Sequence, residues 1–76
     1  MILLNVNNPK YSIYYIAYEV MKVLLNTKEG MDMRKLYDEF NRATGIQFEL
    51  FMLAMDWLYL NEKIEVRKDM KIVLCF

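Results

Sequence analysis

The strongest signal in this chain comes from Gln47-Phe-Glu-Leu-Phe-Met-Leu-Ala-Met-Asp-Trp-Leu-Tyr-Leu-Asn61. It predicts a helix that is apolar almost all the way round, interrupted only by the acidic Glu49 and Asp56. A surface helix needs one apolar stripe facing the core. This helix therefore carries more apolar surface than its own packing requires.

The segment before it predicts a second, more ordinary helix. After a turn over Thr27–Gly30, Asp32 is a good N-cap, with Met31 and Leu36 placed as a hydrophobic staple. The helix continues to about Thr44, and Gly45 supplies the left-handed residue that ends it just before residue 47. The spacing predicts an inward set of Met33, Leu36, Tyr37, Phe40 and Ala43, and a solvent-facing set of Arg34, Lys35, Asp38, Glu39 and Arg42.

A third helix precedes both and runs to about Asn26. Its start is capped either by Asn8, with Pro9 in the first helical position, or by Ser12. The predicted buried stripe is Ile13, Ile16, Ala17, Val20, Val23 and Leu24, and a second apolar strip beside it is Tyr14, Tyr18, Met21 and Leu25. Only Tyr15, Glu19 and Lys22 are left for solvent.

Downstream of residue 61, two short strands are predicted over Lys63–Arg67 and Lys71–Cys75. Ile64 and Val66 alternate with polar residues, as do Ile72 and Leu74, around the polar turn Arg67–Met70. The chain is thus predicted to form three helices, of which the last two are tightly joined, followed by a hairpin. This order predicts an α+β, mainly α, winged helix-turn-helix in a single domain over residues 1–76. Residues 1–8 are either an extended leader or an additional strand.

The helix over residues 47–61 occupies the position of the DNA-recognition helix in such a fold. On a helical wheel Leu50, Leu53, Ala54, Trp57 and Leu58 form the predicted core side, and Phe48, Met52, Met55 and Tyr59 gather opposite, within an arc of about 60°. Base recognition in the major groove needs donors and acceptors that Met and aromatic residues lack. Met and aromatics are instead enriched in protein interfaces, so this outer stripe predicts a protein-binding surface. The alternative is that the wheel is rotated or the hairpin covers the stripe, so that it belongs to the core.

Tyr14, Tyr18 and Met21 extend the candidate interface to the first helix. The cluster Tyr11, Tyr14, Tyr15 and Tyr18 is equally compatible with half-exposed packing, and stacking of single-stranded bases is disfavoured because only Lys10 and Lys22 lie nearby. Arg67, Lys68 and Lys71 could touch phosphate, although a solvated hairpin tip explains them as well.

Composition limits the remaining classes. Hydrophobic residues make up 57% of the 76 residues, and ten basic residues balance ten acidic ones, which argues against an autonomous nucleic-acid binder. No apolar run is long enough to span a bilayer and no signal peptide is indicated, so a cytoplasmic location is expected. With one Cys and no His, we expect no disulfide and no metal site. No catalytic constellation or cofactor motif is present, so we expect no enzyme.

Several residue patterns between Tyr14 and Val66 resemble a known family. They are Tyr15-Ile16, Leu36-Tyr37, the run from Gly45 to Leu60, and Lys63-Ile64. Together they resemble the small middle components of bacterial ABC-three-component systems, which are predicted anti-phage conflict modules. The pattern departs from the resemblance at Met55, which stands where Leu precedes the Asp.

The resemblance implies a non-catalytic adaptor that joins an SMC-like or RecF-like ATPase to an effector protein. It carries no catalytic residues over to this chain. Two alternatives stay open: a small DNA-binding regulator acting as a homodimer through the first helix, and a homodimer that buries both apolar surfaces by two-fold symmetry.

Overall fold

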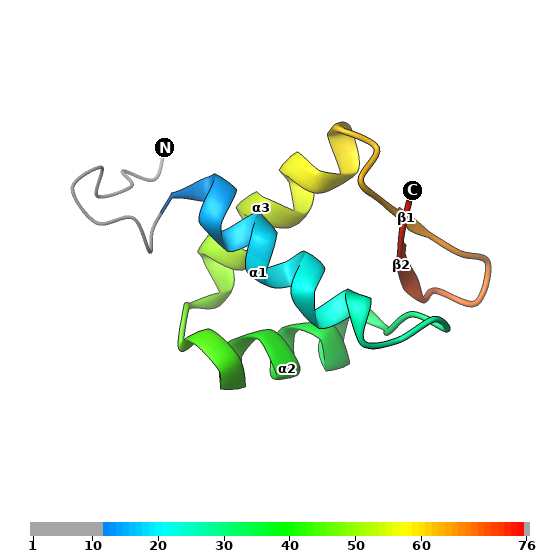
Figure 1. The fold of residues 1–76 in the computed structure, drawn as a ribbon, viewed down its shortest axis with the longest axis horizontal. Coiled ribbons are helices and arrows are strands. Elements are labelled where there is room, and N and C mark those ends of the chain that lie inside the picture. The colour runs from blue at the N-terminus through cyan, green and yellow to red at the C-terminus, as the bar shows by residue number, and fades with distance from the viewer. Residues whose placement is uncertain (1–11, 76) are drawn as a thin grey trace.

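The computed structural model describes residues 12–75 and places three helices ahead of a two-stranded hairpin (Figure 1). The helices are α1 (Ile13–Leu25), α2 (Met33–Thr44) and α3 (Phe48–Leu60), and the strands are β1 (Ile64–Val66) and β2 (Ile72–Leu74). This is the predicted mainly helical layout of a winged helix-turn-helix. The predictions for residues 1–8, the Asn8–Pro9 cap and Tyr11 lie outside the described residues.

Helix α1 begins at the second of the two predicted positions. The Ser12 hydroxyl accepts a hydrogen bond from the Tyr14 N–H at 3.2 Å, so Ser12 is the N-cap. Of the predicted buried stripe of α1, Ile16, Ala17, Val20 and Leu24 are buried in the core, whereas Ile13 and Val23 are only half-buried against it. Tyr15 was expected in solvent, but it is half-buried and packs against the core cluster.

Hydrogen bonds from side chains fix both ends of α2, including the tight turn that leads to α3. The Asp32 carboxylate caps its start by accepting from the Lys35 N–H at 2.8 Å. At the other end Gly45 is left-handed with φ 72°, and the Asn41 side-chain amide donates to the Ile46 carbonyl at 3.1 Å. Of the predicted inward set, Leu36 and Phe40 are buried and Tyr37 is half-buried. Met33 and Ala43, by contrast, are exposed, so the predicted inward set is too wide.

Helix α3 is rotated relative to the predicted wheel. The buried residues are Leu50, Phe51, Ala54, Met55 and Leu58. At 100° per residue, the mean direction of this set is turned by about 60° around the helix axis from that of the predicted core set. The prediction that Met55 faces outward is therefore wrong, since only 4% of its surface is exposed. The prediction that Leu53 faces inward is also wrong, since Leu53 is 36% exposed. Trp57, also predicted inward, is half-buried at the edge of the core.

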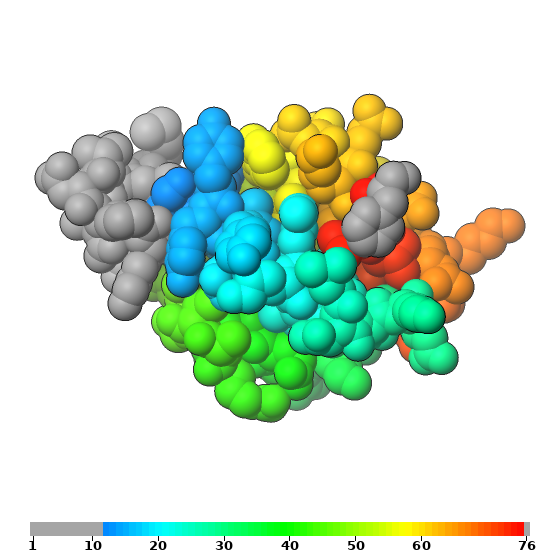
Figure 2. All heavy atoms as spheres, in the orientation of Figure 1, coloured from blue at the N-terminus to red at the C-terminus, as the bar shows by residue number. Residues whose placement is uncertain are grey.

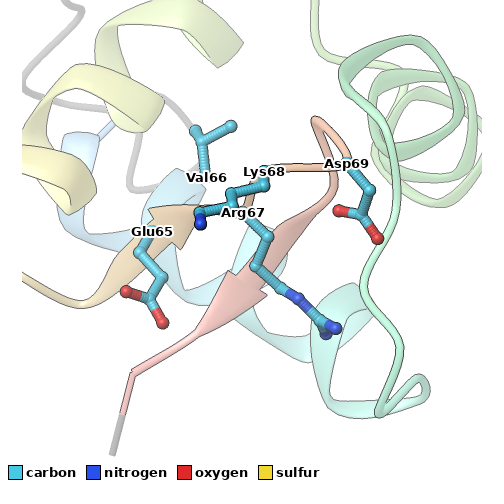
Figure 3. Close-up of a pocket in the computed structure, with 5 residues that line it drawn as sticks. All are labelled: Glu65, Val66, Arg67, Lys68 and Asp69. Atoms are coloured by element: carbon cyan, nitrogen blue, oxygen red, sulfur yellow. The ribbon is translucent and has the colours of Figure 1, made fainter.

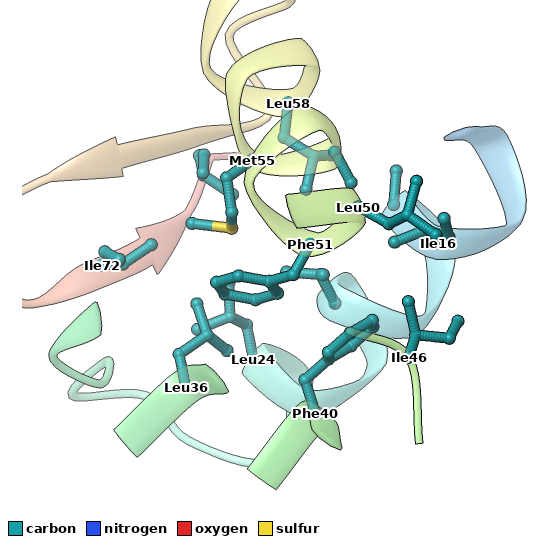
Figure 4. Packing of buried hydrophobic residues seen from close by; sticks show 14 residues of the cluster. Ile16, Leu24, Leu36, Phe40, Ile46, Leu50, Phe51, Met55, Leu58 and Ile72 are labelled. Atoms are coloured by element: carbon teal, nitrogen blue, oxygen red, sulfur yellow. The ribbon is translucent and has the colours of Figure 1, made fainter. Parts of the chain in front are cut away.

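The rotation has a physical cause in the packing partners of Phe51. Its ring centroid lies 5.1 Å from that of Phe40 and 5.1 Å from that of Tyr37, both on α2. Figure 4 shows Phe51 pointing from α3 toward α2, with the Met55 side chain next to it on the side of Ile72. Burying a Phe at the helix–helix contact turns Met55 toward the hairpin.

The hairpin is held to the helices through a bridge that sequence patterning did not indicate. Strands β1 and β2 are antiparallel, with Ile64 opposite Leu74 and Val66 opposite Ile72. Met31, ahead of α2, exchanges two backbone hydrogen bonds with Ile72: its N–H donates at 3.1 Å, and its carbonyl accepts at 2.7 Å. Buried Ile64 and Ile72 then close the core from the hairpin side.

Candidate protein-interaction surface

Helix α1 carries a line of exposed apolar side chains beside its buried stripe. Tyr14, Tyr18 and Leu25 share one side of the helix at spacings of four and seven residues, and each is more than half exposed. Met21, predicted to join them, is half-buried and packs against the core. The Lys22 ammonium lies 5.2 Å from the centroid of the Tyr18 ring and 3.3 Å from a Glu19 carboxylate oxygen.

A ring contact joins this line to α3. Tyr14 meets Trp57 edge to face, with ring centroids 5.6 Å apart and planes at 88°. Leu53 and Leu60 are exposed on the same side of α3 as Trp57, at spacings of four and three residues from it. We call this surface the α1–α3 apolar face; its residues are Tyr14, Tyr18, Leu25, Leu53, Trp57 and Leu60.

The two helices are exposed next to each other on the surface of the molecule. Figure 2 shows α1, in blue and cyan, exposed across the middle of one face with the yellow turns of α3 beside it. Leu60 is 78% exposed and Tyr14 is 68% exposed. Monomeric proteins scatter single apolar residues over their surfaces, whereas a group of large ones on two packed helices is typical of an interaction site.

The other flank of α3 holds the rest of the predicted interface. Phe48 is exposed, but its ring packs edge-on against Tyr37 with centroids 5.1 Å apart, which partly anchors it to α2. Tyr59 is exposed, and Met52 is half-buried against the core. These three lie on one side of α3 as predicted, without Met55.

The line between the two flanks of α3 is acidic. Glu49 and Asp56 are both exposed there, and the helix contains no Lys or Arg. Phosphate repels carboxylates, and base edges need donors such as Arg or Asn on this face. The outer face of α3 is thus unsuited to the DNA contact that its place in the fold would allow.

The hairpin turn carries the predicted phosphate-contact residues in a charge-balanced setting. Figure 3 shows a shallow recess lined by Arg67, Lys68 and Val66 together with Glu65 and Asp69. Two cationic and two acidic residues line it together, and Lys71, which is half-buried, donates its backbone N–H to the Asp69 carboxylate at 3.1 Å. The turn therefore lacks the concentrated positive field of a phosphate site.

The single cysteine has the environment of an unreactive thiol. Partial burial raises the pKa of Cys75 above its ordinary value, and the carboxylates of Glu65 and Glu62 raise it further. A raised pKa leaves the thiol protonated at neutral pH, which makes it a poor nucleophile.

Residues 12–75 contain no group of three or more His, Cys, Asp or Glu placed to hold a metal ion. No helix in the same described range is long and apolar enough to cross a membrane.

Sequence patterning found some of this surface and missed part of it. Tyr14 and Tyr18 lie on the α1–α3 apolar face, and Phe48, Met52 and Tyr59 share the opposite flank of α3. It missed Leu53 and Trp57, which it assigned to the core, and Leu60, which it assigned to neither side. Their spacing of i, i+4 and i+7 was the available signal, but it could not be told from a core stripe on a helix that is apolar all round.

Fold and surface together define a winged helix-turn-helix protein whose α3 is apolar and acidic where a DNA-binding relative would be basic. The chain belongs to the family of ABC-three component (ABC-3C) system Middle Component 6, whose model matches residues 3–75. This match confirms the resemblance drawn from the residues. No curated protein and no solved structure matches the chain.

Proposed function

We propose that the chain is a non-catalytic adaptor that docks onto larger subunits of its three-component system through the α1–α3 apolar face. In this proposal it links an SMC-like or RecF-like ATPase to an effector in anti-phage defence. Membership of a family of system components supports the existence of protein partners. The observation that carries the proposal is the exposure of large apolar side chains on two adjacent helices.

Burial of the α1–α3 apolar face against a partner would stabilise a complex. Burial of apolar area stabilises association by about 25 cal/mol per Å², offset by the cost of fixing the partners. Tyr14 and Trp57 already pack against each other, so part of this face is ordered before any partner arrives. Preordered aromatic side chains lose little entropy on binding and are common at the energetic centres of interfaces.

The adaptor proposal predicts that Leu60→Glu abolishes co-purification with the other two components of the system. Leu60 is 78% exposed, so the charge leaves the fold intact but makes burial of this position costly. The measurement is pull-down of co-expressed components, with circular dichroism to verify the fold.

Met70→Glu is the matched control for that experiment. Met70 is 70% exposed in the turn between β1 and β2, outside the α1–α3 apolar face, so the same change should not affect co-purification. Equal loss of binding in both variants would show a general charge effect. Unchanged binding of Leu60→Glu would remove the α1–α3 apolar face from the proposal.

A further inference from the structure

Asp56 is a charged residue at the centre of an otherwise apolar part of α3. Its helical neighbours at three and four residues on either side are Met52, Leu53, Tyr59 and Leu60. Asp56 is exposed, as are three of those four neighbours, while Met52 is half-buried. The carboxylate thus projects from the middle of a ring of large apolar side chains.

Within residues 12–75 the Asp56 carboxylate is exposed and makes no side-chain contact with a cation or a hydrogen-bond donor. Within residues 12–75 the ion pairs are Lys22–Glu19 and Arg42–Glu39, and no side-chain hydrogen bond in that range involves Asp56. Asp is a poor residue in the middle of a helix. Glu49, by contrast, lies in the first turn of α3, where the helix dipole favours a negative charge.

A carboxylate surrounded by large apolar side chains offers a partner protein one charged contact inside an apolar surface. Residues that dominate binding energy gather at such centres, and surrounding apolar contacts exclude water from them. Arg is enriched there, because its guanidinium can bind a carboxylate through two parallel hydrogen bonds while its aliphatic stem packs on apolar neighbours.

We propose that the outer face of α3 binds a helix of a partner protein that presents an arginine in the middle of an apolar stripe, with the guanidinium paired to Asp56. This inference rests on the proposed adaptor function and specifies the chemistry of the partner. A second copy of α3 does not fit, since this helix has no cation and would oppose carboxylate to carboxylate. DNA is excluded from the same face by its charge.

The test measures the affinity of the purified chain for the other two components of its system, each added separately. Asp56→Asn keeps the size of the side chain and removes its charge. We expect it to weaken binding to one of the two components about thirtyfold or more, as for loss of one partner of an interfacial charge pair. Asp38→Asn is the matched control, because Asp38 is an exposed Asp on α2, away from this face, and should leave the affinity unchanged.

A charge exchange gives the second, independent measurement. Asp56→Arg should abolish binding, and replacing one arginine of the partner helix by Asp should restore it. If the Asp56→Asn variant binds as tightly as the wild-type chain, this inference is overturned while the adaptor function stands. Failure of the wild-type chain to bind either component would overturn the adaptor function and this inference with it.

Discussion

Gly30 and Gly45 both adopt the left-handed backbone conformation, yet only one of them is confined by its neighbours. A Cβ atom on Gly30 would lie 2.5 Å from the Ile72 carbonyl oxygen and 2.6 Å from Cγ1 of Val73. A Cβ atom on Gly45 would meet nothing within 4 Å. Gly30 is thus needed for the backbone bridge between Met31 and β2, whereas Gly45 is needed only for its conformation.

Comparing the two alanine variants tests this difference. Gly45→Ala should cost about 1–2 kcal/mol of unfolding free energy, which is the strain of a left-handed L-residue. Gly30→Ala should cost more, because the same strain is joined by a clash with the backbone of β2. Urea unfolding followed by circular dichroism measures both, and equal losses would show that the bridge tolerates a methyl group.

At the scale of single elements, α3 is the helix whose orientation matters most for function. The side facing Phe40 and Ile72 is core, and the remaining surface divides into an apolar flank beside α1, a flank beside α2, and an acidic line between them. Met52 and Met55 are three residues apart, but they fall on different sides of the boundary between surface and core.

Truncation of each methionine to alanine checks the orientation of α3. Met55→Ala should lower the unfolding free energy by about 2–5 kcal/mol, as is usual for a buried large-to-small change. Met52→Ala should cost clearly less, because Met52 is only half-buried. Thermal or urea unfolding of the two variants decides the matter, and a larger loss for Met52→Ala would place the predicted outer stripe in the core after all.

Across the whole molecule the charges balance in number, and within residues 12–75 acidic and basic residues are mixed on α1, on α2 and in the hairpin segment, but not on α3. The chain has ten basic and ten acidic residues, yet α3 carries only Glu49 and Asp56. The described basic residues lie on α1, α2, the α1–α2 turn and the hairpin segment, and in the hairpin Arg67 and Lys68 line the same recess as Glu65 and Asp69. Such a distribution favours a protein partner over a polyanion.

A gel-shift series tests this conclusion against the DNA-binding regulator. We expect no retained duplex even at about 50 mM salt, where phosphate contacts are strongest. The regulator alternative instead predicts retention that falls as salt rises and is weakened by Arg67→Ala and Lys68→Ala. Retention with that dependence on salt and on the two substitutions would restore the DNA-binding regulator alternative.

The secondary-structure elements and their order follow from local signals in the sequence. The caps at Ser12 and Asp32, the left-handed Gly45 and the alternation around Arg67–Met70 are local signals, and each of them acts within a few residues of chain. The apolar excess that predicted an interaction surface was equally a property of composition, and the residue patterns of the run from Gly45 to Leu60 were enough to suggest the family.

Which side of α3 forms the surface depends, in contrast, on tertiary contacts. A helix that is apolar all round offers several orientations of similar local energy, so the choice falls to its partners. The ring of Phe51 packs between Phe40 and Tyr37, and the bridge from Met31 to Ile72 brings the hairpin toward Met55. These contacts join residues distant in sequence, and they leave Leu53 and Leu60 exposed while Met55 is buried.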